Sequence, residues 1–145
     1  MDNLVIRELK VGDIEEVSKV YNSIVQLPKR SDLIDELKAQ CKSTGFVNLI
    51  AELDGRIVGF LISYIFHGGF GIDKSAWISL LCAHPDFMGQ GIGQKLAEHA
   101  SNDYKAMGIR DVHTSFNWDS MDLISFFKTL GFDRSEFVNL SIKIP

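Results

Sequence analysis

The sequence predicts a mixed α/β (α+β) fold in which a central mixed β-sheet is flanked by helices. Apolar residues recur with strand and helix periodicities, and strands and helices are partly segregated rather than strictly alternating. No Pro-, Ser- or Gly-rich linker separates two apolar segments, and no repeat appears at a fixed period. We therefore expect a single domain over residues 1–145, with the order strand, helix, helix, three strands, helix, strand, helix, strand.

The N-terminal part is expected to form a strand and two helices. Leu4 to Leu9 alternates apolar and charged residues, which is typical of a half-buried strand. Asp13 can cap the helix that follows, in which apolar residues recur at helical spacing: Ile14, Val17, Val20, Tyr21 and Ile24. Leu27-Pro28 interrupts this helix, and Ser31-Asp32 can start a second helix that ends near Gly45.

A hairpin and a buried strand are expected next. Phe46 to Leu53 and Arg56 to Phe66 are β-rich runs, and Asp54-Gly55 between them is the strongest hairpin signal in the chain. The glycine-rich segment His67 to Ser75 then connects to Trp77 to Ala83. That last run is continuously apolar, which predicts a central strand buried on both faces.

The C-terminal part repeats the mixture of helix and strand. One helix face carries the apolar residues Ile92, Leu96, Ala100, Tyr104 and Met107, and this helix should end at Gly108. Val112 to Phe116 is expected to be a strand, and Met121 to Leu130 a helix that Gly131 stops. The alternating segment Phe137 to Ile144 is expected to be a final strand.

Composition excludes several classes of protein. The formal net charge of −4 and the pI near 5.5 disfavour dedicated nucleic-acid binding. Apolar runs are far shorter than the ~20 residues of a membrane-spanning helix, and the N-terminus does not resemble a secretory signal. Cys41 and Cys82 lie far apart, and the histidines show no ligand spacing. We expect a cytoplasmic protein without a metal site, nucleic-acid partner or membrane partner.

The most informative segment is His84 to Gly93, which reads HPDFMGQGIG between the buried strand and an amphipathic helix. Gly89, Gly91 and Gly93 allow a turn whose N–H groups converge, and the helix N-terminus adds the positive end of its dipole. This pattern predicts a phosphate or pyrophosphate site, although the glycines can also form a plain strand-to-helix turn. A Rossmann fingerprint and a P-loop fit less well, because the third glycine comes one residue early and Gln94-Lys95 follows it.

Leu81 to Leu96, LCAHPDFMGQGIGQKL, resembles the acyl-CoA-binding motif of the GNAT superfamily of N-acetyltransferases. Ser125 to Phe132, SFFKTLGF, is similar to the C-terminal motif of that family, in which an aromatic pair on a helix precedes a Gly-Phe step. Val5 to Val20 resembles its N-terminal strand and helix. The order of elements expected above is also the family's order, so the resemblance covers nearly the whole chain and implies the GNAT acyl-CoA N-acyltransferase fold.

The resemblance implies that acetyl-CoA is the acyl donor. Backbone groups of three residues would contact its pantetheine arm: Leu81, Cys82 and Ala83. The glycine-rich loop would cradle its pyrophosphate with Met88, Gly89, Gln90, Gly91, Ile92, Gly93 and Gln94. Met88 departs from the family pattern, which has Gln or Arg at this place. The backbone donors nevertheless remain.

The implied activity is N-acetyl transfer to a primary amine by direct attack in a ternary complex. Phe127 stands where many members have a tyrosine that protonates the leaving thiolate. The buried strand carries no carboxylate, so a water chain to His84, His113 or Asp119 is the expected substitute for a general base. The alternative is a catalytically degenerate CoA-binding or interaction module on the same fold, which the residues at Met88 and Phe127 motivate.

The acceptor is expected to be an amine on a small molecule or a protein. Its specificity would come from the loops Leu27 to Ser31 and His67 to Ser75. Tyr21 and Tyr64 are candidates to face the acceptor, and each is equally compatible with a place in the core. A homodimer stays open.

Overall fold

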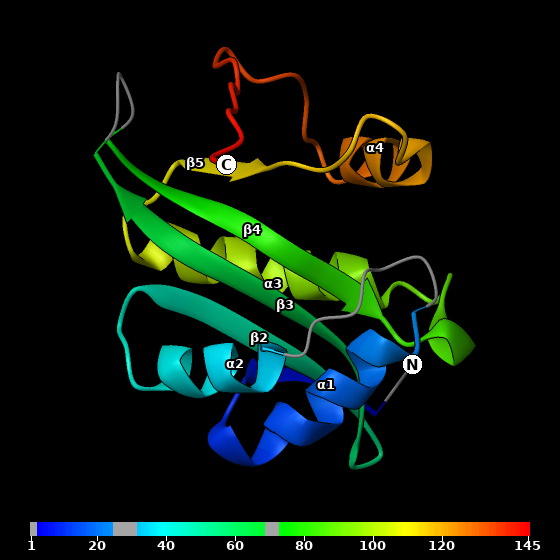
Figure 1. The fold of residues 1–145 in the computed structure, drawn as a ribbon. Helices are drawn as coiled ribbons and strands as arrows, with labels where there is room; N and C mark the ends of the chain where they lie inside the picture. Colours follow the sequence, from blue (N-terminus) through cyan, green and yellow to red (C-terminus); the bar gives the residue numbers. More distant parts are fainter. Residues whose placement is uncertain (1–2, 25–31, 69–72) are drawn as a thin grey trace. The chain divides into compact units, whose positions relative to one another are not determined.

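The computed structural model describes residues 3–24, 32–68 and 73–145 (Figure 1). Residues 25–31 and 69–72 lie outside these ranges, and they include all of the expected acceptor loop Leu27 to Ser31 and part of the expected loop His67 to Ser75. Contacts divide the chain into two compact units, Met1–Ser115 and Phe116–Pro145. A single domain over residues 1–145 stays a prediction.

The first unit contains a five-stranded sheet in the order β1-β2-β3-β4-β5. The strands are β1 Leu4–Glu8, β2 Phe46–Leu53, β3 Arg56–His67, β4 Lys74–Ala83 and β5 Asp111–Thr114. The first four pair antiparallel, and β5 pairs parallel to β4, so the sheet is mixed as expected. The turn between β2 and β3 has positive φ angles of 52° at Asp54 and 80° at Gly55, the geometry that favours such a dipeptide in a hairpin.

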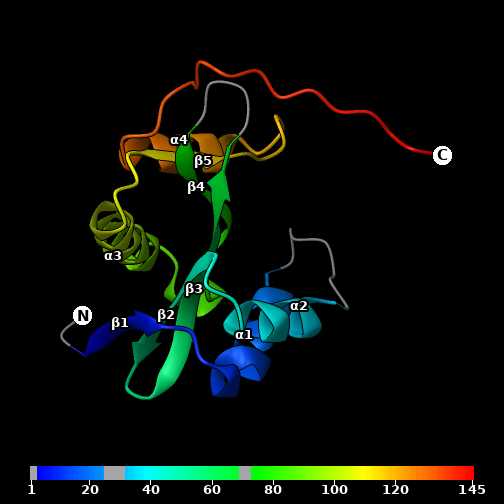
Figure 2. The same cartoon turned by 90° about the vertical axis from the view of Figure 1, so that its left-hand side faces the viewer.

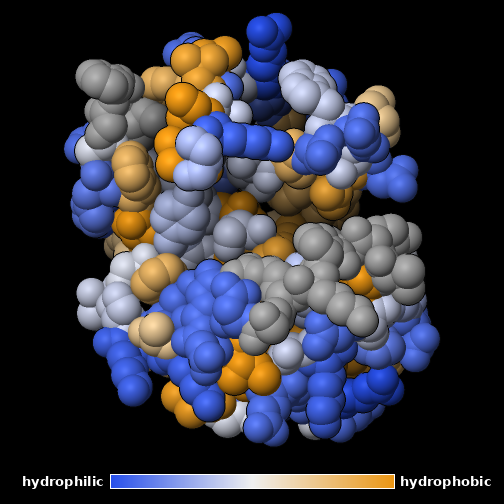
Figure 3. All heavy atoms as spheres, in the orientation of Figure 1, coloured by the Kyte–Doolittle hydropathy of each residue, from blue (hydrophilic) through white to orange (hydrophobic). Residues whose placement is uncertain are grey.

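Helices cover both faces of this sheet (Figure 2). α1 Ile14–Asn22 and α2 Leu33–Cys41 lie on one face, and α3 Ile92–Ala106 lies on the other. The first two helices pack their apolar sides into a core with Phe60, Ile62 and Cys82. Their charged residues face outward, and hydrophilic side chains predominate on the outer surface over α2 (Figure 3). Their amphipathic pattern therefore decides which side meets the sheet.

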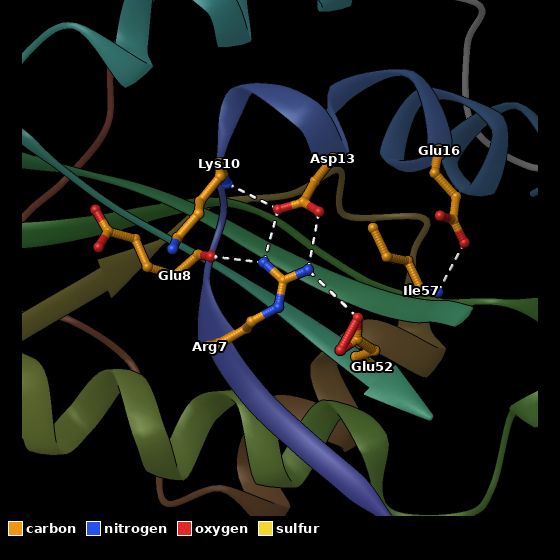
Figure 4. A network of polar contacts seen from close by, with 7 residues as sticks. All are labelled: Arg7, Glu8, Lys10, Asp13, Glu16, Glu52 and Ile57. Carbon is orange, nitrogen blue, oxygen red and sulfur yellow. Dashed lines mark hydrogen bonds and ion pairs between the residues drawn. The ribbon is translucent and has the colours of Figure 1, made fainter. Parts of the chain in front are cut away.

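Arg7 links β1 to the start of α1 (Figure 4). Its guanidinium donates to both carboxylate oxygens of Asp13, at 2.8 and 2.9 Å, and to Glu52 at 3.4 Å. The Asp13 carboxylate also accepts the N–H of Lys10 at 2.8 Å. Asp13 does stand at the N-cap position of α1, but its side chain makes no capping bond there. The expected cap is therefore wrong. The carboxylate instead accepts hydrogen bonds in the turn before α1, from the Arg7 guanidinium and from the N–H of Lys10, and the charged guanidinium is the stronger of these two donors.

The second unit contains α4 Met121–Thr129 and no described strand. The expected final strand Phe137 to Ile144 is wrong. Val138, Leu140, Ile142 and Ile144 are each at least 80% exposed. Alternation makes one side of a segment apolar, but a strand forms only where a neighbouring strand accepts its hydrogen bonds, and the second unit contains no described strand that could do so. Among the described residues no helix is both long and apolar enough to cross a bilayer.

Candidate functional site

β4 and β5 separate after a short run of parallel pairing. Their last pair is Ile78 with Thr114, where the Thr114 hydroxyl donates to the Ile78 carbonyl at 2.9 Å. β3 continues to pair with the opposite edge of β4 as far as Ala83. The edge of β4 from Ser79 to Ala83 that faces away from β3 therefore has no partner strand among the described residues. An extended ligand can bind such an edge through backbone hydrogen bonds.

A bulge marks the same point on β4. The register with β3 shifts between Ile62 and Ser63, so Ser79 is an extra residue, and its hydroxyl donates to the Ile62 carbonyl at 3.2 Å. Bulges bend a strand and increase its local twist. The prediction that this strand is buried on both faces is wrong for its second half, where Ser79 is exposed and Leu81 half-buried. Loss of the β5 neighbour accounts for this exposure.

The residues expected at the pantetheine arm, Leu81, Cys82 and Ala83, lie on this unpaired part of β4. Their contact with a pantetheine arm stays a prediction, for which this edge offers backbone groups without a partner strand among the described residues. The Cys82 thiol is buried in the core, and burial raises its pKa to about 12. Because the thiolate is the nucleophilic form, Cys82 is poorly suited to form a covalent acyl intermediate near neutral pH.

The glycine-rich loop connects β4 to α3. Gly89 and Gly91 have φ angles of +77° and +82°, a region that other residues rarely adopt. Gly91 is the N-cap of α3, no side chain caps the helix, and no acidic residue lies in its first turn. The first N–H groups of α3 are thus left for an anion, which the helix dipole also favours. This arrangement supports the expected pyrophosphate site.

Gly59 on β3 belongs to the same site, although the sequence reasoning did not single it out. A Cβ atom there would lie 2.7 Å from Cγ2 of Ile92 and 2.9 Å from the Cys82 carbonyl oxygen. The glycine therefore lets the start of α3 approach the unpaired half of β4. An isolated glycine inside a β-rich run was the available signal, because it often marks a close backbone approach.

A second missed residue is Arg56 at the start of β3. Its guanidinium carbon lies 5.3 Å from the centre of the Phe87 ring, one residue before Met88. The Met88 side chain is 54% exposed and brings no charge to the loop. Arg56 thus places a cation beside a loop whose own sequence lacks the Gln or Arg of the family pattern. No local sequence signal indicated this contact, because the two residues are far apart in the chain.

Two of the expected proton acceptors lie at different places in the first unit. His84 Nδ1 accepts the N–H of Asp86 at 3.1 Å and so caps the turn Pro85–Phe87, while its Nε2 lies 3.5 Å from the Arg56 guanidinium. His113 lies on β5 opposite Trp77, next to the last pair before β4 and β5 separate. Its ring stacks on that of Trp77, with centroids 4.7 Å apart. His113 is therefore the candidate beside the separating strands.

The third expected proton acceptor, Asp119, and the position of the usual proton donor, Phe127, belong to the second unit. Asp119 is exposed there. Phe127 is buried among the rings of Phe116, Phe126 and Phe132, with centroid distances of 5.5, 5.4 and 5.1 Å. Aromatic packing of this kind accounts for a phenylalanine at this position without any role in proton transfer. Of the candidate acceptor tyrosines, Tyr21 is buried in the core and Tyr64 is partly exposed.

Comparisons with known proteins bear on the family and the fold. The model of the Acetyltransferase (GNAT) family matches residues 13–132. An aminoglycoside acetyltransferase from an uncultured soil metagenomic sample, solved with sisomicin, has a TM-score of 0.82 at 20% identity, covering 99% of this chain and 98% of that chain. The aminoglycoside N-acetyltransferase AAC(6')-Iy with CoA has a TM-score of 0.83 at 18% identity, covering 97% and 94%.

A ribosomal-protein-alanine N-acetyltransferase from Brucella melitensis biovar Abortus 2308 is similar as well. Its TM-score is 0.80 at 18% identity, covering 97% of this chain and 99% of that chain. Likeness at such identities shows a shared fold, and it leaves the acceptor of this chain to be argued from the site.

Proposed function

This chain belongs to the Acetyltransferase (GNAT) family and has its mixed α/β fold, and from that premise we propose that it transfers an acetyl group from acetyl-CoA to a primary amine. The observation that carries the proposal is the continuity between the unpaired edge of β4, Ser79 to Ala83, and the uncapped N-terminus of α3. The edge suits an extended arm with amide groups. The helix terminus suits a pyrophosphate.

In this proposal the backbone of Leu81, Cys82 and Ala83 contacts the pantetheine arm. The loop Met88–Gln94 holds the pyrophosphate through its N–H groups, and Arg56 adds a positive charge beside it. Acetyl-CoA supplies an activated acetyl thioester. The acceptor amine attacks it directly in a ternary complex. The raised pKa of the buried Cys82 thiol argues against Cys82 as a covalent carrier of the acetyl group.

His113 is the residue we propose for removal of the amine proton, directly or through water. It lies beside the point where β4 and β5 separate, and an imidazole can accept a proton near neutral pH. Phe127 has no proton to donate, so the thiolate leaves without help from that position. Backbone N–H groups on the unpaired edge of β4 can stabilise negative charge on the thioester oxygen.

Two observations favour a second candidate function, a CoA-binding module without chemistry. Met88 lacks the polar or charged side chain usual at its place, and Phe127 is packed as core within its unit. One assay distinguishes the two functions. The protein is incubated with acetyl-CoA and each of a panel of primary amines, and the free thiol that is released is measured. Thiol release that requires an amine supports the transferase. A rise in melting temperature with CoA but no thiol release with any amine supports the module.

A further inference from the structure

A row of ring side chains crosses neighbouring strands of the sheet. Tyr64 on β3 lies opposite Trp77 on β4, and Trp77 lies opposite His113 on β5. Residues directly opposite each other project to the same face of a sheet. The stacked rings of Trp77 and His113, with an interplanar angle of 22°, bear this out for one pair. We call Tyr64, Trp77 and His113 the aromatic row.

The aromatic row lies on the sheet face that α1 and α2 cover elsewhere. Side chains of β3 alternate between faces, so Tyr64 shares the face of Phe60 and Ile62. Those two residues pack in the core with α1 and α2 and are 0% and 3% exposed. Tyr64 is 38% exposed. The helices therefore bury the first part of this face, whereas in the aromatic row Tyr64 is exposed and Trp77 and His113 are half-buried.

The aromatic row also borders the point where β4 and β5 separate. Trp77 and His113 form the pair before the last one, and the unpaired edge begins at Ser79. In the proposed function the thioester end of acetyl-CoA lies at this point, so an acceptor must approach it here. The inference below rests on that proposed function for the identity of its ligand.

Ring faces carry negative electrostatic potential and attract ammonium groups. His113 covers one face of Trp77, so the face on the side of Tyr64 is the one that a cation would meet. Lys74 on β4 does not compete for them, since its ammonium donates to the Met107 carbonyl at 3.0 Å, and the chain as a whole has a net charge of −4. We propose that the aromatic row forms the floor of the site for the acceptor, here called the acceptor floor, and that it binds a protonated amino group. The attacking amine must be neutral. The bound cation is therefore a second amino group, and the acceptor class is diamines and polyamines.

Binding is tested with choline and 3,3-dimethylbutan-1-ol, which have the same shape but differ in charge. The chain has two tryptophans, so Trp118→Phe leaves Trp77 as the only indole reporter; Trp118 is exposed. With CoA present, we expect choline to change the Trp77 emission and to bind about five-fold more tightly than the neutral alcohol. Equal affinities of the two probes would overturn the proposal.

Two matched variants in the Trp118→Phe background test whether choline binds at the aromatic row. Tyr64→Leu should weaken choline binding about three-fold through loss of one ring face. Phe66→Leu is the control, because Phe66 is 39% exposed on the same strand but two residues farther from the separating strands. Choline affinity should be unchanged in this control. An equal loss in both variants would assign the effect to general apolar exposure and reject the aromatic row.

Kinetics with 1,4-diaminobutane and butylamine separate this proposal from the proposed function. We expect the diamine to have the lower KM, and Trp77→Leu and Tyr64→Leu to raise that KM about five-fold without raising the KM of butylamine. Thiol release from both amines with equal KM values overturns the acceptor floor and leaves the transferase intact. Absence of thiol release with every amine overturns the transferase, while the choline titration still reports on the aromatic row.

Discussion

Gly59 and Ile92 approach so closely that no side chain fits between them: a Cβ atom on Gly59 would lie 2.7 Å from Cγ2 of Ile92. This contact brings the start of α3 against the unpaired half of β4. We expect Gly59→Ala to lower the free energy of unfolding by about 1–3 kcal/mol, as overpacking does in a dense core. CoA binding should weaken as well, because α3 must shift. Urea denaturation and a CoA titration measure the two effects.

Gly12→Ala is the control for this substitution. A Cβ atom at Gly12 would meet nothing within 4 Å, and its backbone does not adopt a positive φ. The control should therefore change neither stability nor CoA affinity beyond about 0.5 kcal/mol. If Gly59→Ala behaves like Gly12→Ala, the approach of α3 does not depend on the glycine.

A positive charge can be added to the glycine-rich loop by substituting Met88. We expect Met88→Arg to tighten CoA binding at low salt, because a cation is added beside the expected pyrophosphate. The gain should be below about 1 kcal/mol and should shrink as salt rises, since the side chain is exposed. Calorimetric titration at several salt concentrations measures it. Val5→Arg adds the same charge at an exposed position on β1 and should have no such effect; an equal gain there would show that only net charge matters.

A hydroxyl at Phe127 should destabilise the protein. The ring is buried among three phenylalanine rings, so the added hydroxyl of Phe127→Tyr would have no polar partner among them. We expect a loss of about 1–3 kcal/mol of stability and no gain in thiol release per folded molecule. Phe137→Tyr, at an exposed ring, is the control. A faster release with unchanged stability would instead place Phe127 at the reacting atoms.

Acid should weaken the contact between Arg7 and Asp13. Hydrogen bonding to the Arg7 guanidinium lowers the pKa of the Asp13 carboxyl below its usual 3.8. Stability from this shift is present above pH 3.8 and is lost as the pH falls through the lower folded value. Asp13→Asn should therefore cost about 1–3 kcal/mol at pH 7, and the difference from the parent should shrink below about pH 4. Thermal unfolding from pH 7 to pH 2 measures it.

Glu136→Gln removes an exposed carboxylate and is the control for that series. Its melting temperature should equal that of the parent protein at every pH. A constant difference between Asp13→Asn and the parent down to pH 2 would contradict the shifted pKa of Asp13.

Local patterns predicted much of this fold. The Asp54-Gly55 hairpin, the helix from Ile92 and the glycine turn before it depend on neighbouring residues, and the structure has all of them. Features that depend on distant partners were missed or wrong. The Asp13 carboxylate binds Arg7 rather than capping α1, and the unpaired half of β4 reflects where β5 ends. Phe137 to Ile144 has the pattern of a strand, but the second unit contains no described strand with which it could pair.

The candidate site divides in the same way. Its loop could be recognised from the glycines, because their spacing is local. The roles of Gly59 and Arg56 and the pairing of Trp77 with His113 come from strand register and helix packing, which link residues far apart in the chain. Register cannot be read from one strand alone.

The central claim is that the N-terminus of α3 and its glycine loop bind the pyrophosphate of CoA, and the thermal shift of Gly91 variants tests it most directly. At about 100 times its Kd, CoA should stabilise the parent by roughly 2.7 kcal/mol. Gly91→Ala and Gly91→Glu share the same backbone strain at φ +82°, so they differ in the added carboxylate. We predict that CoA still raises the melting temperature of Gly91→Ala and no longer raises that of Gly91→Glu. An undiminished shift in Gly91→Glu would contradict the site.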